Sequence, residues 1–336
     1  MKKPHSYYFS CFNSRLSFLC LALLILTLFY VFFSPLVGFD LRNESFAQVD
    51  IMSLPDGSGG TDSLFRDMLS SVEGAISISA DVKQQIRMFG QDYKTFGSYN
   101  ELKTTELRGK GAVRFRLDLR VESPTHAAEA SPRNSLTIVC DNTCTYIYRY
   151  LTLEDEKRLE RIEIKRVVEA IEKQGRNDIP TEAGSLFGLG GLAGMLREMR
   201  NRYDFSAAPV PTQINEKDGN EKNKAITVWK IHGRLKPEIV TRLTAEISGK
   251  KQTIPKHTPT AIDIYIGRED RFPYRFDYYW TPEGTESNAD PFAYLLFYNI
   301  VLHDRNNIPE TIFDFRPPDN FPPEDITDKI TNLFMR

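Results

Sequence analysis

Thr260 to Trp280 has the sequence TAIDIYIGREDRFPYRFDYYW, which alternates as a β-hairpin does. Successive side chains of a strand point to opposite faces, so residues two apart share a face. Before the turn at Gly267, isoleucines alternate with Asp263 and Tyr265, and after it aromatic residues alternate with charged ones. Each strand therefore has one apolar face. On the second strand this face consists of Tyr274, Phe276, Tyr278 and Trp280.

Two structures would produce this aromatic face. One is the core face of an antiparallel sheet, and the other is the lining of a hydrophobic cavity. Both require the same alternation, so the hairpin sequence predicts the strands and leaves the two alternatives open.

The composition is that of an ordinary globular protein, with 41% hydrophobic and 26% charged residues in 336. The many aromatic residues, 22 Phe and 15 Tyr, favour a β-rich fold, because aromatic side chains suit a pleated surface. A net charge of −2 gives no basic patch for nucleic acid, so we expect no nucleic-acid partner. Five His and four Cys leave little material for metal or nucleophile chemistry, and we expect no cofactor.

Leu16 to Phe33 is an apolar run whose length lies between that of a membrane-spanning helix and that of a long signal-peptide core. Lys2, Lys3 and Arg15 precede it and acidic residues follow, which predicts a cytoplasmic N-terminus and an exported remainder. No A-x-A-like cleavage site follows, which favours an uncleaved membrane anchor over a cleaved signal.

The sequence divides into three parts. Residues 1–39 form the N-terminus and signal anchor, residues 40–62 form a Gly- and Pro-containing linker, and residues 63–336 form one domain. The linker as a flexible coil would span about 26 Å. We expect the domain in the periplasm, anchored to the inner membrane, or free in the periplasm if the signal is cleaved.

Apolar alternation predicts further strands over residues 75–86, 107–121, 136–150 and 225–233. Residues 294–303 are apolar on both faces, which predicts a strand covered on both sides. Gly90, Gly97 and Asn100 mark turns between the first two. Residues 312–315 predict a last short strand, and apolar residues from Ile326 onward predict a terminal helix.

Cys140 and Cys144 bracket the turn Asp141-Asn142-Thr143 of a second predicted hairpin. Outside the cytoplasm they are candidates for a disulfide, which would close a short loop and stabilise the fold by only about 2 kcal/mol. Their spacing is also that of a metal half-site. No second Cys or His pair of suitable spacing exists, so we expect no metal.

Residues 184–203, GSLFGLGGLAGMLREMRNRY, are both apolar and Gly-rich. The glycine spacing matches neither phosphate-binding motif. Each glycine weakens a helix by about 1 kcal/mol, so we expect an apolar loop that becomes helical near Leu192. It is either a movable lid or an ordinary helix packed on the sheet. Its apolar residues join the aromatic face as the predicted ligand-binding set: Leu186, Phe187, Leu189, Leu192, Met195, Leu196 and Met199.

Two motifs resemble the LolA-like lipoprotein-carrier family, over about residues 64–335. The segment from Asn299 to Pro318, with Phe313-Asp314-Phe315-Arg316-Pro317-Pro318, resembles the family's last strand, F-x-F-x-P-P. The hairpin VCDNTCTYIY at 139–148 is similar to the family's S-D-G-K-x-L-W-x-Y, with Asn142 in place of Gly and Tyr146 in place of Trp. The pattern resembles LolA-like proteins of uncharacterised planctomycete type more than it resembles the proteobacterial carrier.

This resemblance implies an α+β, mostly β fold: a half-open antiparallel β-barrel with helices packed as a lid. It implies non-catalytic binding of the acyl chains of a lipid or lipoprotein, in which each buried CH₂ contributes about 0.8 kcal/mol. The lid arginine of the proteobacterial carrier follows an R-P motif that does not occur in the expected lid segment, residues 184–203, so its role passes to no residue of this chain.

Two other functions remain as alternatives. A membrane-anchored sensor or scaffold would bind an unknown protein partner and need no lipid. An enzyme would need catalytic groups, and Asp263, Glu269, Asp270 and Asp277 lie near one another in sequence. No Ser, His or Cys stands in a nucleophile motif, so we expect no enzyme. A short tether favours a fixed binding module over a free shuttle.

Overall fold

The fold comes from a computed structural model, which describes residues 60–88, 91–104, 112–121, 135–141, 143–151, 156–173, 191–215, 225–244, 254, 258–280, 290–304, 306–317 and 320–335. The expected anchor, residues 16–33, lies outside these ranges, and so do Leu186, Phe187 and Leu189. Among the described residues no helix is long and apolar enough to cross a membrane.

The described chain is mostly β, with thirteen strands in one large sheet. The strands are β1 (Ser77–Met88), β2 (Gln91–Thr104), β3 (Ala112–Val121), β4 (Ser135–Cys140), β5 (Cys144–Leu151), β6 (Glu156–Glu163), β7 (Tyr203–Asp204), β8 (Val210–Asn215), β9 (Ala225–Leu235), β10 (Ala261–Gly267), β11 (Pro273–Tyr279), β12 (Ala293–His303) and β13 (Glu324–Asp325).

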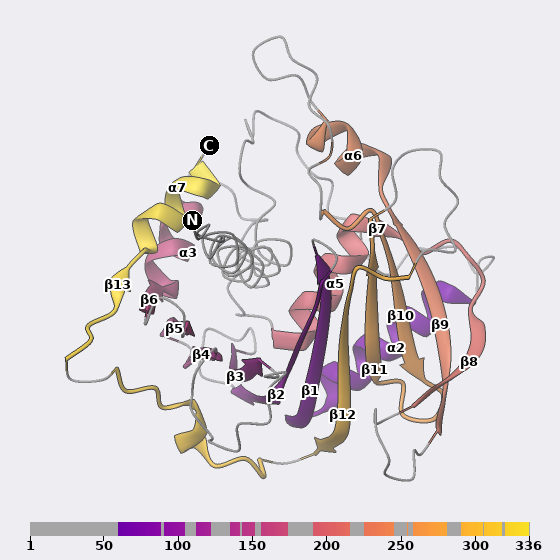
Figure 1. Cartoon of the computed structure of the whole chain (residues 1–336), viewed down its shortest axis with the longest axis horizontal. Helices are drawn as coiled ribbons and strands as arrows, with labels where there is room; N and C mark the ends of the chain where they lie inside the picture. The colour runs from indigo at the N-terminus through magenta and orange to yellow at the C-terminus, as the bar shows by residue number, and fades with distance from the viewer. Residues whose placement is uncertain are drawn as a thin grey trace, which may run out of the picture.

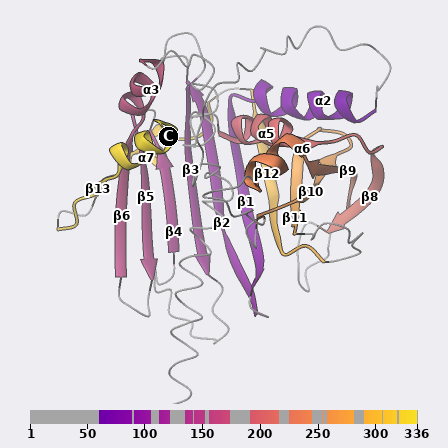
Figure 2. The same cartoon turned by 90° about the horizontal axis from the view of Figure 1, so that it is seen from above.

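The helices are few and short beside this sheet. They are α2 (Thr61–Gly74), α3 (Ile164–Glu172), α5 (Gly191–Arg202), α6 (Pro237–Leu243), α7 (Thr327–Met335) and the 3₁₀ helix η1 (Glu310–Phe313). Figure 2 shows α2 and α5 lying side by side along one face of the sheet, while α3 and α7 pack together near β6.

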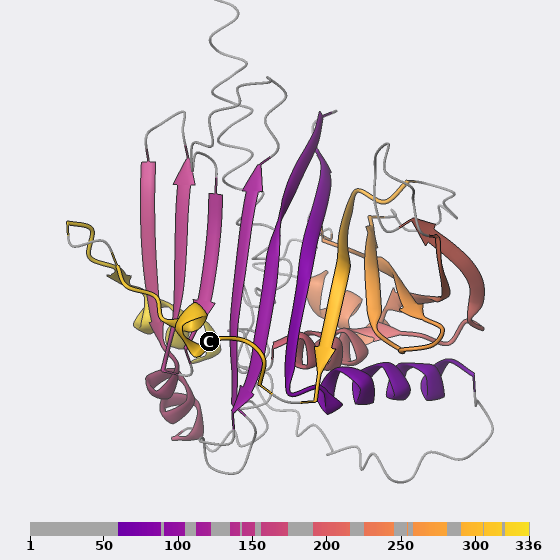
Figure 3. The same cartoon turned by 90° about the horizontal axis from the view of Figure 1, so that it is seen from below.

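The sheet has two halves that meet at its middle. Strands β1 to β6 cross one half in chain order, and β12 to β9 cross the other, as Figure 3 shows. The halves join where β1 pairs antiparallel with β12, from Ser77 opposite His303 to Ile86 opposite Ala293. The first and last long strands of the chain are therefore central neighbours.

The sheet is open. Figure 1 shows its strands following an arc, and within the described residues β13 and β7 stand at opposite ends of the strand order and do not pair with each other. The resemblance implied a half-open barrel; the coarser prediction, a mostly β chain with a large antiparallel sheet and a few helices, is confirmed.

The hairpin predicted at 260–280 is confirmed as β10 and β11. Ile264 lies opposite Phe276 and Ile262 opposite Tyr278, so the isoleucine face and the aromatic face coincide. All four side chains belong to the buried core. Asp263 lies opposite Asp277 on the other face of the sheet.

The turns predicted at Gly97 and Asn100 are wrong, because both residues lie inside the long strand β2. A Cβ at Gly97 would stand 1.6 Å from the Asp118 carbonyl oxygen of β3. The glycine therefore permits close backbone approach within the sheet, a role that glycine also has in strands.

The short strand predicted at 312–315 is also wrong. Glu310–Phe313 form η1, and the segment around η1 crosses the outer face of the first half of the sheet. The Arg116 guanidinium donates to the Ile312 carbonyl over 3.1 Å, and Phe315 packs on Tyr146 with ring centroids 5.2 Å apart. The segment thus packs on the outer face of the sheet and does not add a strand to it.

The predicted hairpin at 136–150 is confirmed as β4 and β5, but Cys140 and Cys144 are not joined by a disulfide. Cys140 lies opposite Thr145, and neighbouring residues of a strand point to opposite faces. Cys144 therefore points away from Cys140. The Cys140 thiol instead donates a hydrogen bond to the Val113 carbonyl oxygen, with 3.7 Å between sulfur and oxygen.

Candidate functional site

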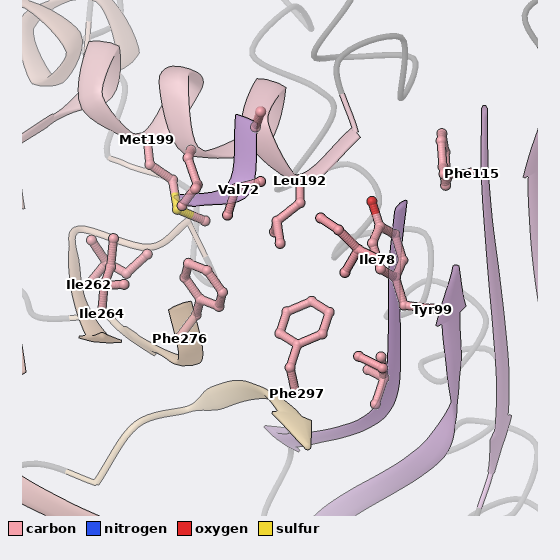
Figure 4. Packing of buried hydrophobic residues seen from close by; sticks show 14 of the residues in the cluster. Val72, Ile78, Tyr99, Phe115, Leu192, Met199, Ile262, Ile264, Phe276 and Phe297 are labelled. Carbon is pink, nitrogen blue, oxygen red and sulfur yellow. The ribbon is translucent and has the colours of Figure 1, made fainter. Parts of the chain in front are cut away.

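The inner face of the sheet is a continuous apolar surface beneath α2 and α5. Figure 4 shows Ile262, Ile264, Phe276 and Phe297 projecting from three neighbouring strands toward Met199 and Leu192 of α5. Aromatic rings meet edge to face there, with the Phe276 and Phe297 centroids 6.3 Å apart. This geometry is typical of closely packed aromatic cores.

The predicted ligand-binding residues of α5 lie on this surface. Leu192, Leu196 and Met199 are buried in the core cluster, and Met195 packs against it while partly exposed. Of the aromatic face, Phe276 and Tyr278 are buried and Tyr274 is partly buried. The helix and the hairpin therefore meet.

Trp280 is not brought into this group. It follows the last residue of β11 and is 36% exposed. Its alternation with Tyr278 predicted a shared face, but a pleat extends only as far as the strand does.

Helix α5 closes the described part of the apolar face. Leu196 has no exposed surface, and neither do Ile262 and Phe276 below it. Two surface pockets lie beside this packed face. One of about 310 Å³ lies between α2 and the end of α5, with Phe65, Arg200 and Lys236 in its wall, and one of about 200 Å³ is lined by Arg87, Arg275 and Tyr294. A ligand on the inner face would therefore have to displace α5.

A fully buried charged residue lies on this face beneath α5. Glu101 of β2 faces Ile78 and Phe115 across the sheet and has no exposed surface. Its Oε2 accepts hydrogen bonds from the Leu192 backbone N–H at 2.8 Å and from the Tyr99 hydroxyl at 2.5 Å. Burial raises the pKa of Glu101, although these two bonds and the charge of Lys103 act in the opposite direction.

A second polar group occupies the outer face of β9 to β11. Asp263 lies opposite Asp277, and both carboxylates are almost fully buried. His232 Nδ1 lies 2.6 Å from Asp263, and the Tyr279 hydroxyl donates to the same carboxylate over 3.1 Å. Asp277 accepts hydrogen bonds from Arg275 at 2.6 Å and from the Tyr265 hydroxyl at 2.9 Å.

The pKa values of these two carboxyl groups are shifted in opposite directions. Burial opposes ionisation of Asp263, but the hydrogen bond with His232 and the charge of Lys230 lower its pKa below the usual range. Burial raises the pKa of Asp277, with the attraction of Arg275 opposing that shift and the charge of Asp263 adding to it. Asp263 is therefore the more acidic carboxyl group of the pair.

The hydrogen bonds of this outer group join strands β9, β10 and β11 on the outer face of the sheet. The contacts described use both carboxylates as acceptors, and no hydroxyl or thiol nucleophile is bonded to His232 among them. Within the described ranges, no cluster of three or more His, Cys, Asp or Glu side chains is arranged to hold a metal ion.

Glu101 was missed by sequence reasoning. Alternation in 75–86 and 107–121 identified the strands on either side of β2, but β2 itself is largely polar and carries no apolar alternation. The one indication of a strand there was the number of residues between the two predicted strands, which is large enough for another strand. Pairing with Ile78 and Phe115, which places Glu101 on the inner face, is a tertiary property.

Comparison with known proteins found likeness in structure alone. No protein-family model matches the chain, and no curated protein sequence matches it. A DUF1329 family protein from Desulfovibrio piger is similar at 10% identity and a TM-score of 0.31, over 76% of this chain and 97% of that one.

Two further solved structures are similar to the same extent. LprF from Mycobacterium bovis aligns at 10% identity and a TM-score of 0.29, over 72% of this chain and 95% of that one. A LolA superfamily protein from Nitrosomonas europaea aligns at 9% identity and a TM-score of 0.24, over 76% of this chain and 98% of that one. A LolA-type structure, which the sequence motifs predicted, is thus among those similar to the chain. TM-scores this low support no inference about function, so the proposal below is argued from the geometry of this chain.

Proposed function

We propose that this chain binds the acyl chains of a lipid or lipoprotein on the inner face of its sheet, beneath α5, without catalysis. The observation that carries the proposal is the apolar face itself, which extends from β10 through β12 to β2 and is covered by a short helix. Burial of one acyl chain there would contribute about 0.8 kcal/mol per CH₂ group.

The structure of α5 supports a role as a lid. The helix begins at Gly191 and has only twelve residues, of which two, Ala193 and Gly194, are small and buried. Outside the core its contacts with α2 are surface ion pairs, Arg197 with Glu73 and Arg200 with Asp62. Exposed ion pairs contribute little to stability, so the helix depends on its apolar side chains.

Photolabelling tests the proposal. The full chain in native membranes would be irradiated with a palmitate analogue that carries a diazirine on its chain, and labelled peptides would be mapped by mass spectrometry. We expect label on α5 and β11 that excess palmitate removes, and less label in Met195→Gln. Arg197→Ala on the exposed side of the same helix is the matched control.

Label confined to residues 16–33 would contradict the proposal, because it would report only the membrane around a hydrophobic segment. That result would favour the alternative of a scaffold that binds a protein partner. The closed packing of α5 on the sheet is the observation that favours this alternative, since a scaffold needs no opening.

We further propose that residues 16–33 hold the domain at the inner membrane through the linker, residues 40–62. A tether of about 26 Å would keep the domain from crossing to another membrane. Washing membranes at high salt and alkaline pH tests this: the domain should stay in the membrane fraction. Release of a chain that lacks residues 1–35 would contradict it and point to a cleaved signal.

A further inference from the structure

The closed packing of α5 raises the question of what fastens it. Glu101 is the one carboxylate of β2 that faces α5 with no exposed surface. Burial of a charged or polar group in apolar surroundings is costly unless its partners compensate. A carboxyl group buried at this position therefore indicates a specific role for Glu101.

The contacts of Glu101 join two elements. Leu192 lies in the first turn of α5, where backbone N–H groups have no partner within the helix. Its N–H donates to Glu101 Oε2, and the Tyr99 hydroxyl donates to the same oxygen. Within the part of the chain that the structure describes, the other oxygen, Oε1, is buried with no hydrogen-bond partner. The carboxyl group thus fastens α5 to β2 through one oxygen.

The residue before this contact is shaped for a hinge. Gly191 has a φ of +53°, in the left-handed region that favours glycine. A Cβ at Gly191 would lie 2.4 Å from Glu101 Oε2 and 2.8 Å from Val113 Cγ1. Any side chain there would push the carboxyl group away, so the hinge and the fastening are adjacent.

The charges around Glu101 leave its burial dominant. Lys103 on the same strand donates to the Val72 and Ala75 carbonyls at the end of α2, so its ammonium is engaged elsewhere. Burial raises the pKa of Tyr99, to which the buried Cys140 thiol of β4 also contributes, and Arg197 of α5 pairs with Glu73 of α2.

We propose that Glu101 is a proton-sensitive latch that fastens the first turn of α5 to β2 and so controls how often the apolar face opens. The link to ligand access rests on the proposed function, whereas the latch itself does not. The ligand class it serves is an amphiphile that must pass beneath α5.

The direction of the pH effect follows from the two states of the latch. In the closed state burial raises the pKa of Glu101. In the open state water surrounds the group, and its pKa returns to about 4.3. The closed state therefore binds the proton more tightly and is most stable below the open-state value. That stability is lost as the pH rises through the closed-state pKa, so opening increases with pH.

Hydrogen exchange of the full chain tests this without any ligand. Exchange of peptides from α5 would be followed from pH 4 to pH 8 and corrected for the intrinsic dependence of amide exchange on pH. Between the two pKa values we expect the opening equilibrium to rise about tenfold per pH unit. Peptides from α3 should show no such rise.

Two variants sharpen the test. Glu101→Gln keeps the acceptor oxygen and removes the proton equilibrium, so α5 protection should no longer change with pH. Glu198→Gln, which removes a carboxylate of α5 bonded to Arg202, should keep the wild-type dependence. Gly191→Ala should displace the carboxyl group and raise α5 exchange at every pH while β10 stays protected.

Protection of α5 that is independent of pH in the wild type would overturn the latch, whether or not the variants fold. Equal pH dependence in wild type and Glu101→Gln would overturn it as well. If the latch holds and palmitate labelling fails, the proposed function falls and the latch stands. If palmitate labelling succeeds but the hydrogen-exchange protection of α5 does not depend on pH, the proposed function stands and the latch falls.

Discussion

Asp263 illustrates how a residue that looks unremarkable in sequence acquires a defined chemical state in the fold. It alternates with apolar residues as any polar-face residue does, yet it lies buried opposite Asp277 and accepts hydrogen bonds from two neighbouring side chains. These bonds, with the charge of Lys230, hold its pKa below the usual value against the cost of burial.

We predict that Asp263→Asn lowers the free energy of unfolding by about 1–3 kcal/mol at neutral pH, because it removes a buried charged acceptor. The folded pKa of Asp263 is lowered, so this stability exists above the unfolded pKa of about 3.9 and is lost as the pH falls through the folded value. Urea unfolding of both proteins at several pH values measures it. Asp204→Asn, an exposed aspartate, is the control, and a penalty that persists unchanged at pH 3 would contradict the prediction.

Helix α5 illustrates how far the stability of a helix depends on the side chains of its buried face. Leu196 is fully buried, while Arg197 points outward to Glu73. These two residues are adjacent in sequence but face different sides, because a helix turns about 100° per residue.

We predict that Leu196→Ala costs about 2–5 kcal/mol, the usual range for a leucine truncated in a core. Arg197→Ala should cost less than about 1 kcal/mol, since its ion pair is exposed. Chemical denaturation of both variants gives the comparison. Similar losses for the two would mean that α5 is held by its surface pairs and not by the apolar face.

Elements whose pattern is local were predictable from sequence. The 260–280 hairpin has strict alternation and a polar turn, and the structure confirms both strands and their faces. Strand β2 was not predictable, because it is largely polar and contains Gly97, which reads as a turn. It forms because β1 and β3 pair with it on both sides, and such pairing has no local signal.

The candidate site divides in the same way. Leu192, Leu196, Phe276 and Tyr278 could be assigned to one apolar surface by periodicity alone, and they meet there. Glu101 could not, because its place beneath α5 depends on strand pairing and on the position of a helix far along the chain. Periodicity also places Trp280 with its neighbours, but the strand ends before it.

For the whole molecule, the pairing of β1 with β12 is the contact on which both halves of the sheet depend. Strands β1 to β6 and β12 to β9 each follow in sequence across their half, and among the described strands only this central pair connects the two halves. We predict that backbone amides of β1 and β12 exchange most slowly with solvent, and that amides of the edge strands β8 and β13 exchange fastest. Hydrogen-exchange mass spectrometry of the full chain measures this order. Faster exchange in β1 than in β8 would mean that the two halves unfold separately.

The same central pairing has a consequence for the making of the protein. Ile78 lies opposite Leu302, so the early strand cannot find its neighbour until nearly the whole chain exists. Ribosomes add about 5–20 residues per second, so β1 waits on the order of ten to forty seconds with one edge unpaired. An apolar strand edge exposed for so long is a template for other chains. Slower growth of the nascent chain should therefore raise the fraction lost to aggregates, and a chaperone that shields extended apolar segments should lower it.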